Sequence, residues 1–390
     1  MSLTGRLTVL LAILVAIVVP GVALYSWNRI GQGPQRSAKA LRWTWRSTIL
    51  FASQLSTVIL VAVLVNDAGN FYTSWLELLG EKHSLQHTVA SPGSQDRALR
   101  HDLERARAAG HGLVVKLEIP GTVSGVGSFS GLVYLPIQYG MPQYEHRKFP
   151  VVELVAGSPG TPRSWTHALD VAQVLDQEIA AGRSLPFIAV MPSQEVAGRR
   201  DTQCVDVVGG PQVETYLTTD VRTVVMRAYR ASAQPGAWAL MGYSSGGYCA
   251  TNLAMRHPDM FGAAVSIAGY AHPAHDLQTG ELFGHNAILR DQNTPLWRAT
   301  HLSPPDVALL LMTSAEDALS DADAHAMAAV ARAPLSVSLV SLRHGGHNFE
   351  VWRAEEPVAF GWLSAHLIAP LTPPAVIDNT SPVVVTSQRR

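Results

Sequence analysis

The sequence predicts an α/β fold in which helices cover a mostly parallel sheet, preceded by two helices that cross a membrane. Three observations lead to this prediction. Short apolar runs alternate with helical stretches between residues 151 and 340, a glycine-flanked Ser244 joins one of these runs to an amphipathic segment, and two long uncharged runs precede residue 67. Buried strands that alternate with helices are typical of parallel sheets with helices on both faces.

Two uncharged runs lie in the first eighty residues, at Leu7–Tyr25 and Thr48–Asn66. At about 1.5 Å of rise per residue, each run would span the roughly 30 Å hydrocarbon core of a bilayer. The segment between them is basic and has no acidic residue; it contains Arg29, Arg36, Lys39, Arg42 and Arg46. Since basic loops stay on the cytoplasmic side, we expect residues 1–80 to form a hairpin in the lipid bilayer of the cell membrane, a multi-pass arrangement that places the later residues outside the cytoplasm.

Three alternatives to this membrane hairpin are open. The first run could be a cleavable signal peptide, although no clean small-x-small site follows Pro20 and a second run comes next. The pair could be a buried hairpin of a soluble protein, but neither run has a polar outward face. The topology could also be inverted, with the catalytic domain inside the cell.

The charge balance argues against nucleic acid as a partner. Lysine and arginine number 29 and aspartate and glutamate 30, which gives a net charge of -1. A chain without excess positive charge lacks the basic surface that binds the phosphates of nucleic acids. Only 15% of the residues are charged, as expected when part of a chain lies in lipid.

The domain boundaries follow from changes in pattern. Residues 81–111 are expected to be a linker whose polar stretch, 91–112, forms an exposed helix with a solvated face. A catalytic domain is expected at 112–368, beginning with antiparallel strands at 113–119 and 131–135 and continuing with buried strands at 151–156, 187–191, 237–241, 263–267, 307–312 and 335–340. The Pro-, Thr- and Val-rich tail, 369–390, is expected to be flexible.

The nucleophile candidate is Ser244, in the pattern Gly242-x-Ser244-x-Gly246 between an apolar strand and a helix. A serine at such a strand-to-helix turn sits on a strained bend, where side chains two residues before or after it would collide with backbone. The following helix directs its amide groups at the oxyanion that develops in the reaction. We therefore expect Ser244 to be catalytic rather than a structural turn residue.

A serine hydroxyl needs a base, and the base needs an acid that orients it. The expected chain order is serine, acid, histidine. Glu316 and Asp317 follow an apolar strand, and we favour Asp317. His347 lies in a glycine-containing loop after the last strand and is the expected base, with His344 as its rival.

An oxyanion hole requires two backbone donors. The amide of Ser245, directly after the nucleophile, is one candidate. The amide of Ser158, in the loop after the strand at 151–156, is the other, unless that segment is an ordinary Ser-Pro-Gly turn.

The chain has two cysteines, Cys204 and Cys249. In an oxidising compartment they could form a disulfide between a loop and the helix after Ser244. Alternatively, Cys249 is a small buried residue and Cys204 a free thiol.

These features resemble the esterase D-like branch of the α/β-hydrolases. The matching residues are 151–160, the ETYLTTDV run, the block from Gly242 to Gly269 and the GGHNFEVWR segment that contains His347, and the likeness covers about 112–367. Members usually have His-Gly or Asp-Gly in the oxyanion loop, whereas this chain has Ala156-Gly157. The two-span front end looks like that of membrane-bound actinobacterial members.

The resemblance implies the α/β-hydrolase fold and an acyl-serine intermediate, with no metal and no organic cofactor. The expected function is hydrolysis of a small-molecule or lipid ester. An acyltransferase, similar to mycolyltransferases, would use the same residues, and a non-catalytic membrane-tethered binding protein would keep the fold without the chemistry. Acyl length, alcohol moiety and oligomeric state are set by features that no motif encodes.

Overall fold

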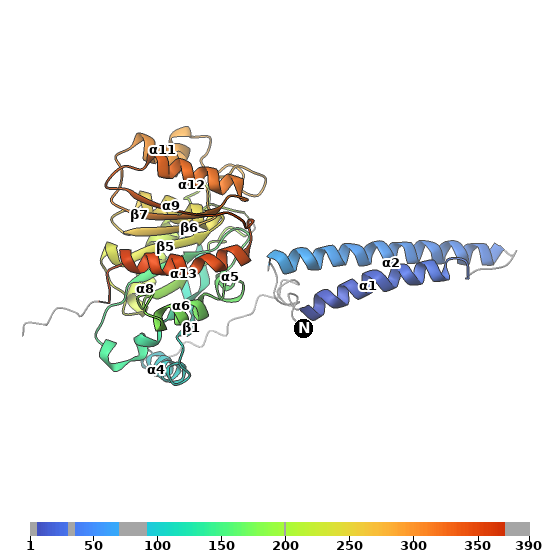
Figure 1. The fold of residues 1–390 in the computed structure, drawn as a ribbon, viewed down its shortest axis with the longest axis horizontal. Helices are drawn as coiled ribbons and strands as arrows, with labels where there is room; N and C mark the ends of the chain where they lie inside the picture. The colour runs from blue at the N-terminus through green and yellow to red at the C-terminus, as the bar shows by residue number, and fades with distance from the viewer. Residues whose placement is uncertain (1–5, 30–35, 70–91, 199, 371–390) are drawn as a thin grey trace, which may run out of the picture.

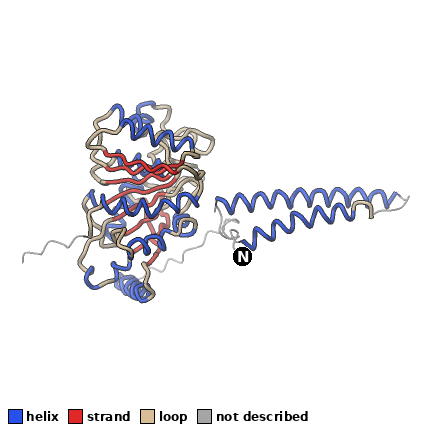
Figure 2. The backbone as a smooth tube through the Cα atoms, in the orientation of Figure 1, coloured by secondary structure: helices blue, strands red, loops and turns tan. Residues whose placement is uncertain are grey.

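A computed structural model describes residues 6–29, 36–69, 92–198 and 200–370 of the 390-residue chain. The first part of the expected linker (81–91) and nearly all of the expected tail (371–390) lie outside the described residues. Figures 1 and 2 show two parts: a pair of long helices and an α/β domain in which helices surround a sheet.

The two N-terminal helices, α1 (Arg6–Ser26) and α2 (Arg36–Gly69), lie side by side (Figure 1). Over Leu7–Ser26 and Leu41–Val65 they are long and apolar enough, by length and composition, to cross a membrane. Ala23, Ile49 and Ser56 are buried, whereas large apolar side chains such as Leu24, 81% exposed, point outward. Small residues let two helices approach closely, and a surface of exposed leucines is costly in water but suits lipid.

The sheet has eight strands in the order β1-β2-β4-β3-β5-β6-β7-β8. Their bounds are β1 (Leu113–Gly121), β2 (Gly127–Leu135), β3 (Val151–Val155), β4 (Ile188–Met191), β5 (Trp238–Tyr243), β6 (Ala263–Ile267), β7 (Ala308–Ser314) and β8 (Ser336–Leu342). β2 pairs antiparallel with β1 and β4, and all other pairs are parallel. This confirms the α/β-hydrolase fold and places the expected strands within a few residues of their expected bounds.

Helices cover both faces of the sheet. One face packs against α5 (Pro162–His167), α6 (Val171–Ala180) and α13 (Phe349–His366). The other packs against a group that includes α8 (Arg222–Ala228), α9 (Ser245–Arg256), α11 (Pro295–His301) and α12 (Ala318–Val330). All residues of β3, β4, β5 and β6 are buried, because helices shield these central strands on both sides.

Shorter elements complete the α/β domain. They are η1 (Ile137–Gly140), η2 (Pro142–Tyr144), α7 (Val213–Thr215), the π-helical turn η3 (Tyr216–Val221), η4 (Pro235–Ala237) and α10 (Ala287–Gln292). The turn η3 falls in the ETYLTTDV run. Its Asp220 accepts hydrogen bonds from Val123 N at 2.9 Å and Ser124 N at 3.0 Å, which ties the β1–β2 hairpin to the helical layer.

The polar helix α4 (Pro92–Ala108) precedes β1, as expected from the sequence, but only part of its surface is solvated. Leu99 and Leu103 pack against the core, and Ala106 is buried. The expected exposed spacer is therefore a helix that is attached to the domain through one apolar face.

Candidate active site

The sequence-predicted site residues come together because parallel strands end at the same edge of the sheet. Ser158 follows β3, Ser244 follows β5, Asp317 follows β7 and His347 follows β8. The site therefore lies at the carboxyl edge of the sheet.

Ser244 sits on a strained turn between β5 and α9, with φ 57° and ψ −127°. A non-glycine residue with positive φ stores strain and persists only where its surroundings hold it there. A Cβ on Gly242 would collide with the carbonyl of Gly246, and a Cβ on Gly246 with the carbonyl of Val155. Both glycines of the motif are thus required by close backbone approach.

Ser244, His347 and Asp317 form a hydrogen-bonded chain. Ser244 Oγ lies 2.8 Å from His347 Nε2, and Asp317 Oδ2 lies 2.7 Å from His347 Nδ1. Because a carboxylate only accepts, Nδ1 carries the proton and donates to Asp317, which leaves Nε2 free to accept from Ser244. The Asp317 side chain is 13% exposed and that of His347 is 43% exposed, so solvent reaches the imidazole but hardly the acid.

Aromatic packing fixes the imidazole. Trp352 meets the ring of His347 edge to face, with centroids 4.9 Å apart, and stacks on Tyr243 at 4.8 Å. Phe349 packs edge to face on both Tyr243 and Trp352. The helix α13 therefore supplies an apolar support under the catalytic histidine candidate.

The two rival residues, Glu316 and His344, pair with each other. Glu316 Oε1 lies 3.0 Å from His344 Nδ1, and Glu316 Oε2 accepts from Gly345 N at 2.9 Å. The Gly345 amide, and secondarily His344, lowers the pKa of Glu316. The His344 and Glu316 side chains are 86% and 54% exposed, so they form a surface pair beside Ser244–His347–Asp317.

The two expected oxyanion donors lie next to each other, and one of them is already bonded. Ser158 N donates to Ser245 Oγ at 2.8 Å. Ser245 begins α9, and the amide of a first helical residue has no carbonyl partner within its own helix. An oxyanion that accepts from both amides would have to replace the Ser245 hydroxyl as the acceptor for Ser158.

Polar side chains from the segment after β4 hold the oxyanion loop, residues 156–160 after β3, which contains the expected donor Ser158. Gln194 Nε2 donates to the carbonyls of Ala156 and Gly157, the latter at 2.9 Å, and Glu195 Oε1 accepts from Gly160 N at 2.8 Å. Burial raises the pKa of Glu195. Sequence reasoning missed this segment, although its position at the carboxyl end of a buried strand is the signal that led to Asp317.

Cys204 and Cys249 form a disulfide, with Cα atoms 5.6 Å apart and both side chains buried. This confirms the predicted bond. It joins the segment after β4 to α9, the helix that begins directly after Ser244, so this segment is covalently tied to the helix that carries one expected oxyanion donor, Ser245.

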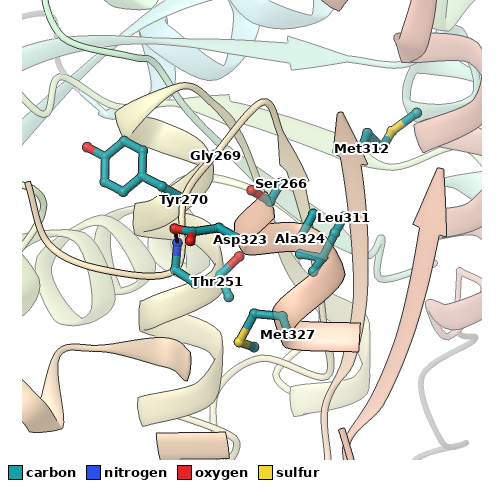
Figure 3. Close-up of a pocket in the computed structure, with 10 residues that line it drawn as sticks. Thr251, Ser266, Gly269, Tyr270, Leu311, Met312, Asp323, Ala324 and Met327 are labelled. Carbon is teal, nitrogen blue, oxygen red and sulfur yellow. Dashed lines mark hydrogen bonds between the residues drawn. The ribbon is translucent and has the colours of Figure 1, made fainter. Parts of the chain in front are cut away.

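A small cavity shown in Figure 3 lies away from these residues, between α9, β6, β7 and α12. Its volume is about 10 Å³, and it is lined by residues that include Thr251, Ser266 and Asp323. Such a space holds about one water molecule and no substrate. Within the described residues, no group of three or more His, Cys, Asp or Glu side chains is placed to hold a metal ion.

Relatives of this chain were found by sequence. An uncharacterized protein of Corynebacterium glutamicum is 24% identical over 267 residues, which cover 65% of this chain and 62% of that protein. The MPT51/MPB51 antigen of Mycobacterium tuberculosis is 34% identical over 74 residues, covering 19% of this chain and 24% of the antigen. The chain therefore spans less than two thirds of the length of either relative.

Solved structures with the same fold include a ferulic acid esterase, with a TM-score of 0.55 and 22% identity, covering 66% of this chain and 99% of that one. An S-formylglutathione hydrolase from Agrobacterium tumefaciens has a TM-score of 0.57 and 14% identity, covering 66% and 97%. At these identities the likeness establishes the fold. The sequence model described as putative esterase matches residues 127–362, more than half of the chain and all of the strands from β2 to β8. The chain therefore belongs to the putative esterase family.

Proposed function

We propose that this chain is a serine carboxylesterase in which Ser244 is the nucleophile, His347 the general base and Asp317 the acid that orients the base. The observation that carries the proposal is the unbroken hydrogen-bonded chain from Ser244 Oγ through both imidazole nitrogens to Asp317. A strained nucleophile turn and an aromatic support under the imidazole favour this assignment over a structural role.

The reaction follows from the positions of the protons. His347 Nε2 takes the proton from Ser244 Oγ as the oxygen attacks the ester carbonyl, and Asp317 stabilises the imidazolium that results. The amides of Ser158 and Ser245 donate to the tetrahedral oxyanion. The imidazolium then protonates the departing alcohol, which leaves an acyl-Ser244. A water molecule, deprotonated by His347, attacks this acyl group, and the acid is released as the proton returns to Ser244.

Acyl transfer to an alcohol would use the same first half-reaction, so this alternative needs an acceptor other than water. The exposure of His347 to solvent favours water as the second nucleophile. Product analysis in the presence of increasing sugar or lipid alcohol distinguishes the two. A transferase would form new ester at the expense of free acid.

We further propose that α1 and α2 anchor the enzyme in a bilayer and that the catalytic domain lies outside the cytoplasm. The apolar length of both helices and the basic segment around Arg42 and Arg46 support the anchor and its orientation. The disulfide supports the same side, because such bonds persist in oxidising compartments. Protease added to intact cells should digest the domain of the full-length chain, and protection until lysis would overturn the orientation.

The catalytic proposal is tested with Ser244→Ala and the matched control Ser128→Ala, a change of an exposed serine on β2. We expect Ser244→Ala to lose about 10⁴-fold or more in kcat/KM on short p-nitrophenyl esters and to lose fluorophosphonate labelling. The control should keep both. Hydrolysis that survives in Ser244→Ala would overturn the assignment of the nucleophile.

A further inference from the structure

The Ser245 hydroxyl, at the variable position of the nucleophile motif, bonds to the loop after β3. It accepts a hydrogen bond from Ser158 N at 2.8 Å. Ser245 is 4% exposed, so water does not compete for this bond. A hydroxyl oxygen accepts through its lone pairs, and one of them is directed at the Ser158 amide.

The helix that Ser245 begins is itself fixed by its surroundings. Cys249 of this helix, α9, is bonded to Cys204 in the segment after β4. The neighbouring Gln203 donates to Tyr270 Oη and accepts from Ala274 N, both at 2.8 Å. The start of α9 is therefore tied to the segments after β4 and β6.

The position of this hydroxyl matters because it accepts from Ser158 N, one of the two expected oxyanion donors. The oxyanion must lie beside Ser244 Oγ and the Ser245 amide, and the Ser245 Oγ atom is three bonds from its own amide nitrogen. An amide that donates to this oxygen is therefore already directed toward the region where the oxyanion forms. We propose that the Ser245 hydroxyl is a positioning group that keeps the Ser158 amide directed at the oxyanion site until the oxyanion displaces it as acceptor.

The displacement favours the transition state over the bound substrate. A hydrogen bond to a charged oxygen is roughly twice as strong as one to a neutral oxygen. The neutral ester carbonyl gains little by displacing the hydroxyl, whereas the oxyanion gains a stronger bond than the one it breaks. An interaction that is realised only in the transition state raises kcat without tightening substrate binding. The proposal rests on the proposed esterase function and adds a residue to it.

The test uses two substitutions in the full-length protein, Ser245→Ala and Ser245→Cys. The first removes the hydroxyl, and the second keeps a similar volume but offers only a weak acceptor. Ser266→Ala is the matched control, because Ser266 is a similarly buried serine, on β6. Thermal unfolding of each variant checks that the domain is folded.

We expect both Ser245 variants to lose about tenfold in kcat with no rise in KM, a smaller loss than the roughly 10²- to 10³-fold that follows removal of an oxyanion donor itself. Phenylboronic acid forms an anionic tetrahedral adduct with Ser244 that places one of its oxygens in the same position, so its affinity should fall by a similar factor. The control should keep both values.

Three results would overturn the proposal: a kcat within twofold of wild type in both variants, an unchanged affinity for phenylboronic acid, or a faster Ser245→Ala enzyme, which would make the hydroxyl a mere competitor. If the wild-type protein hydrolysed no ester, the proposed function would fail and this inference with it. If only the Ser245 variants behaved like wild type, this inference alone would fail.

Discussion

The two sides of Ser244 are held in place by different interactions. On the base side, His347 lies on the aromatic support of Trp352, and its partner Asp317 comes directly from a strand end. On the oxyanion side, the loop after β3 is held by buried polar groups, chiefly Gln194 and Ser245, and by a disulfide nearby. In the proposed mechanism, proton transfer therefore depends on a few direct contacts, whereas oxyanion binding depends on a network that extends into neighbouring loops.

The largest effect is expected on the base side, from Asp317→Asn. The amide keeps the shape of the acid, but it can donate to Nδ1 and so favours the wrong tautomer of His347. We expect kcat to fall about 10⁴-fold. Glu316→Gln is the matched control, because Glu316 is the adjacent carboxylate and bonds to His344 instead. Its kcat/KM should stay within about threefold of wild type.

The opposite pair of results would contradict the assignment of Asp317 as the acid. A strong loss in Glu316→Gln together with a weak one in Asp317→Asn would mean that the acid is the exposed carboxylate. The base side would then depend on His344, and the hydrogen bond between Asp317 and His347 would have no catalytic part.

Much of the fold could be predicted from sequence because the strands are short apolar runs bounded by turns. The run at Ala263–Ile267 was predicted with its observed bounds, and the bounds of the other buried strands differ by at most two residues. The attachment of α4 could not be predicted, since Leu99 and Leu103 are too few to mark an apolar face in a strongly charged segment. Only the position of the core shows that they are buried.

The site also contains residues that could be predicted from sequence and residues that could not. Ser244, Asp317 and His347 carry local signals: a glycine-flanked turn, an acid after a strand and a glycine-rich loop. Gln194 has no such signal, because it acts on backbone groups 37 and 38 residues away. The hydrogen bond from Ser158 to Ser245 depends on the placement of the loop after β3 relative to the start of α9, which no spacing in the sequence encodes.

The next largest effect is expected on the oxyanion side, where removal of the disulfide should lower the stability of the domain. Cys204 and Cys249 are separated by 45 residues. Closing a loop of this length restricts the unfolded chain, so we expect Cys204→Ala with Cys249→Ala to lower the free energy of unfolding by about 4 kcal/mol. Urea denaturation measures the change. Wild-type protein treated with a reductant should shift by a similar amount, and a reduced wild type of unchanged stability would contradict the prediction.

A smaller effect is expected in β3, the strand that leads into the oxyanion loop. Complete burial raises the pKa of Glu153 to about 8 from an ordinary value of 4.5. Because the folded state binds the proton more tightly, the stability from this group is full below about pH 4.5 and is lost as the pH rises to about 8. Glu153→Gln should therefore reduce this decline, by roughly 3 kcal/mol between pH 5 and pH 8.

Chemical denaturation at several pH values measures this difference, and equal pH slopes in variant and wild type would contradict it. The activity of the same variant shows whether a change within β3 reaches the oxyanion loop. Glu153 lies inside the sheet and contacts neither oxyanion amide in the described structure, so kcat/KM of the folded variant should match wild type at pH 7.

The smallest expected effect comes from Gln194→Met, which replaces the amide with an apolar side chain of similar volume. The carbonyls of Ala156 and Gly157 would lose their donor, and the loop that carries the Ser158 amide would be less well oriented. We expect kcat/KM to fall about tenfold, the equivalent of about 1.4 kcal/mol of transition-state stabilisation. Gln173→Met, an exposed change on α6, controls for the substitution itself. Wild-type kcat/KM in Gln194→Met would show that the oxyanion loop keeps its shape without polar support, and the two sides of Ser244 would then differ less than their contacts indicate.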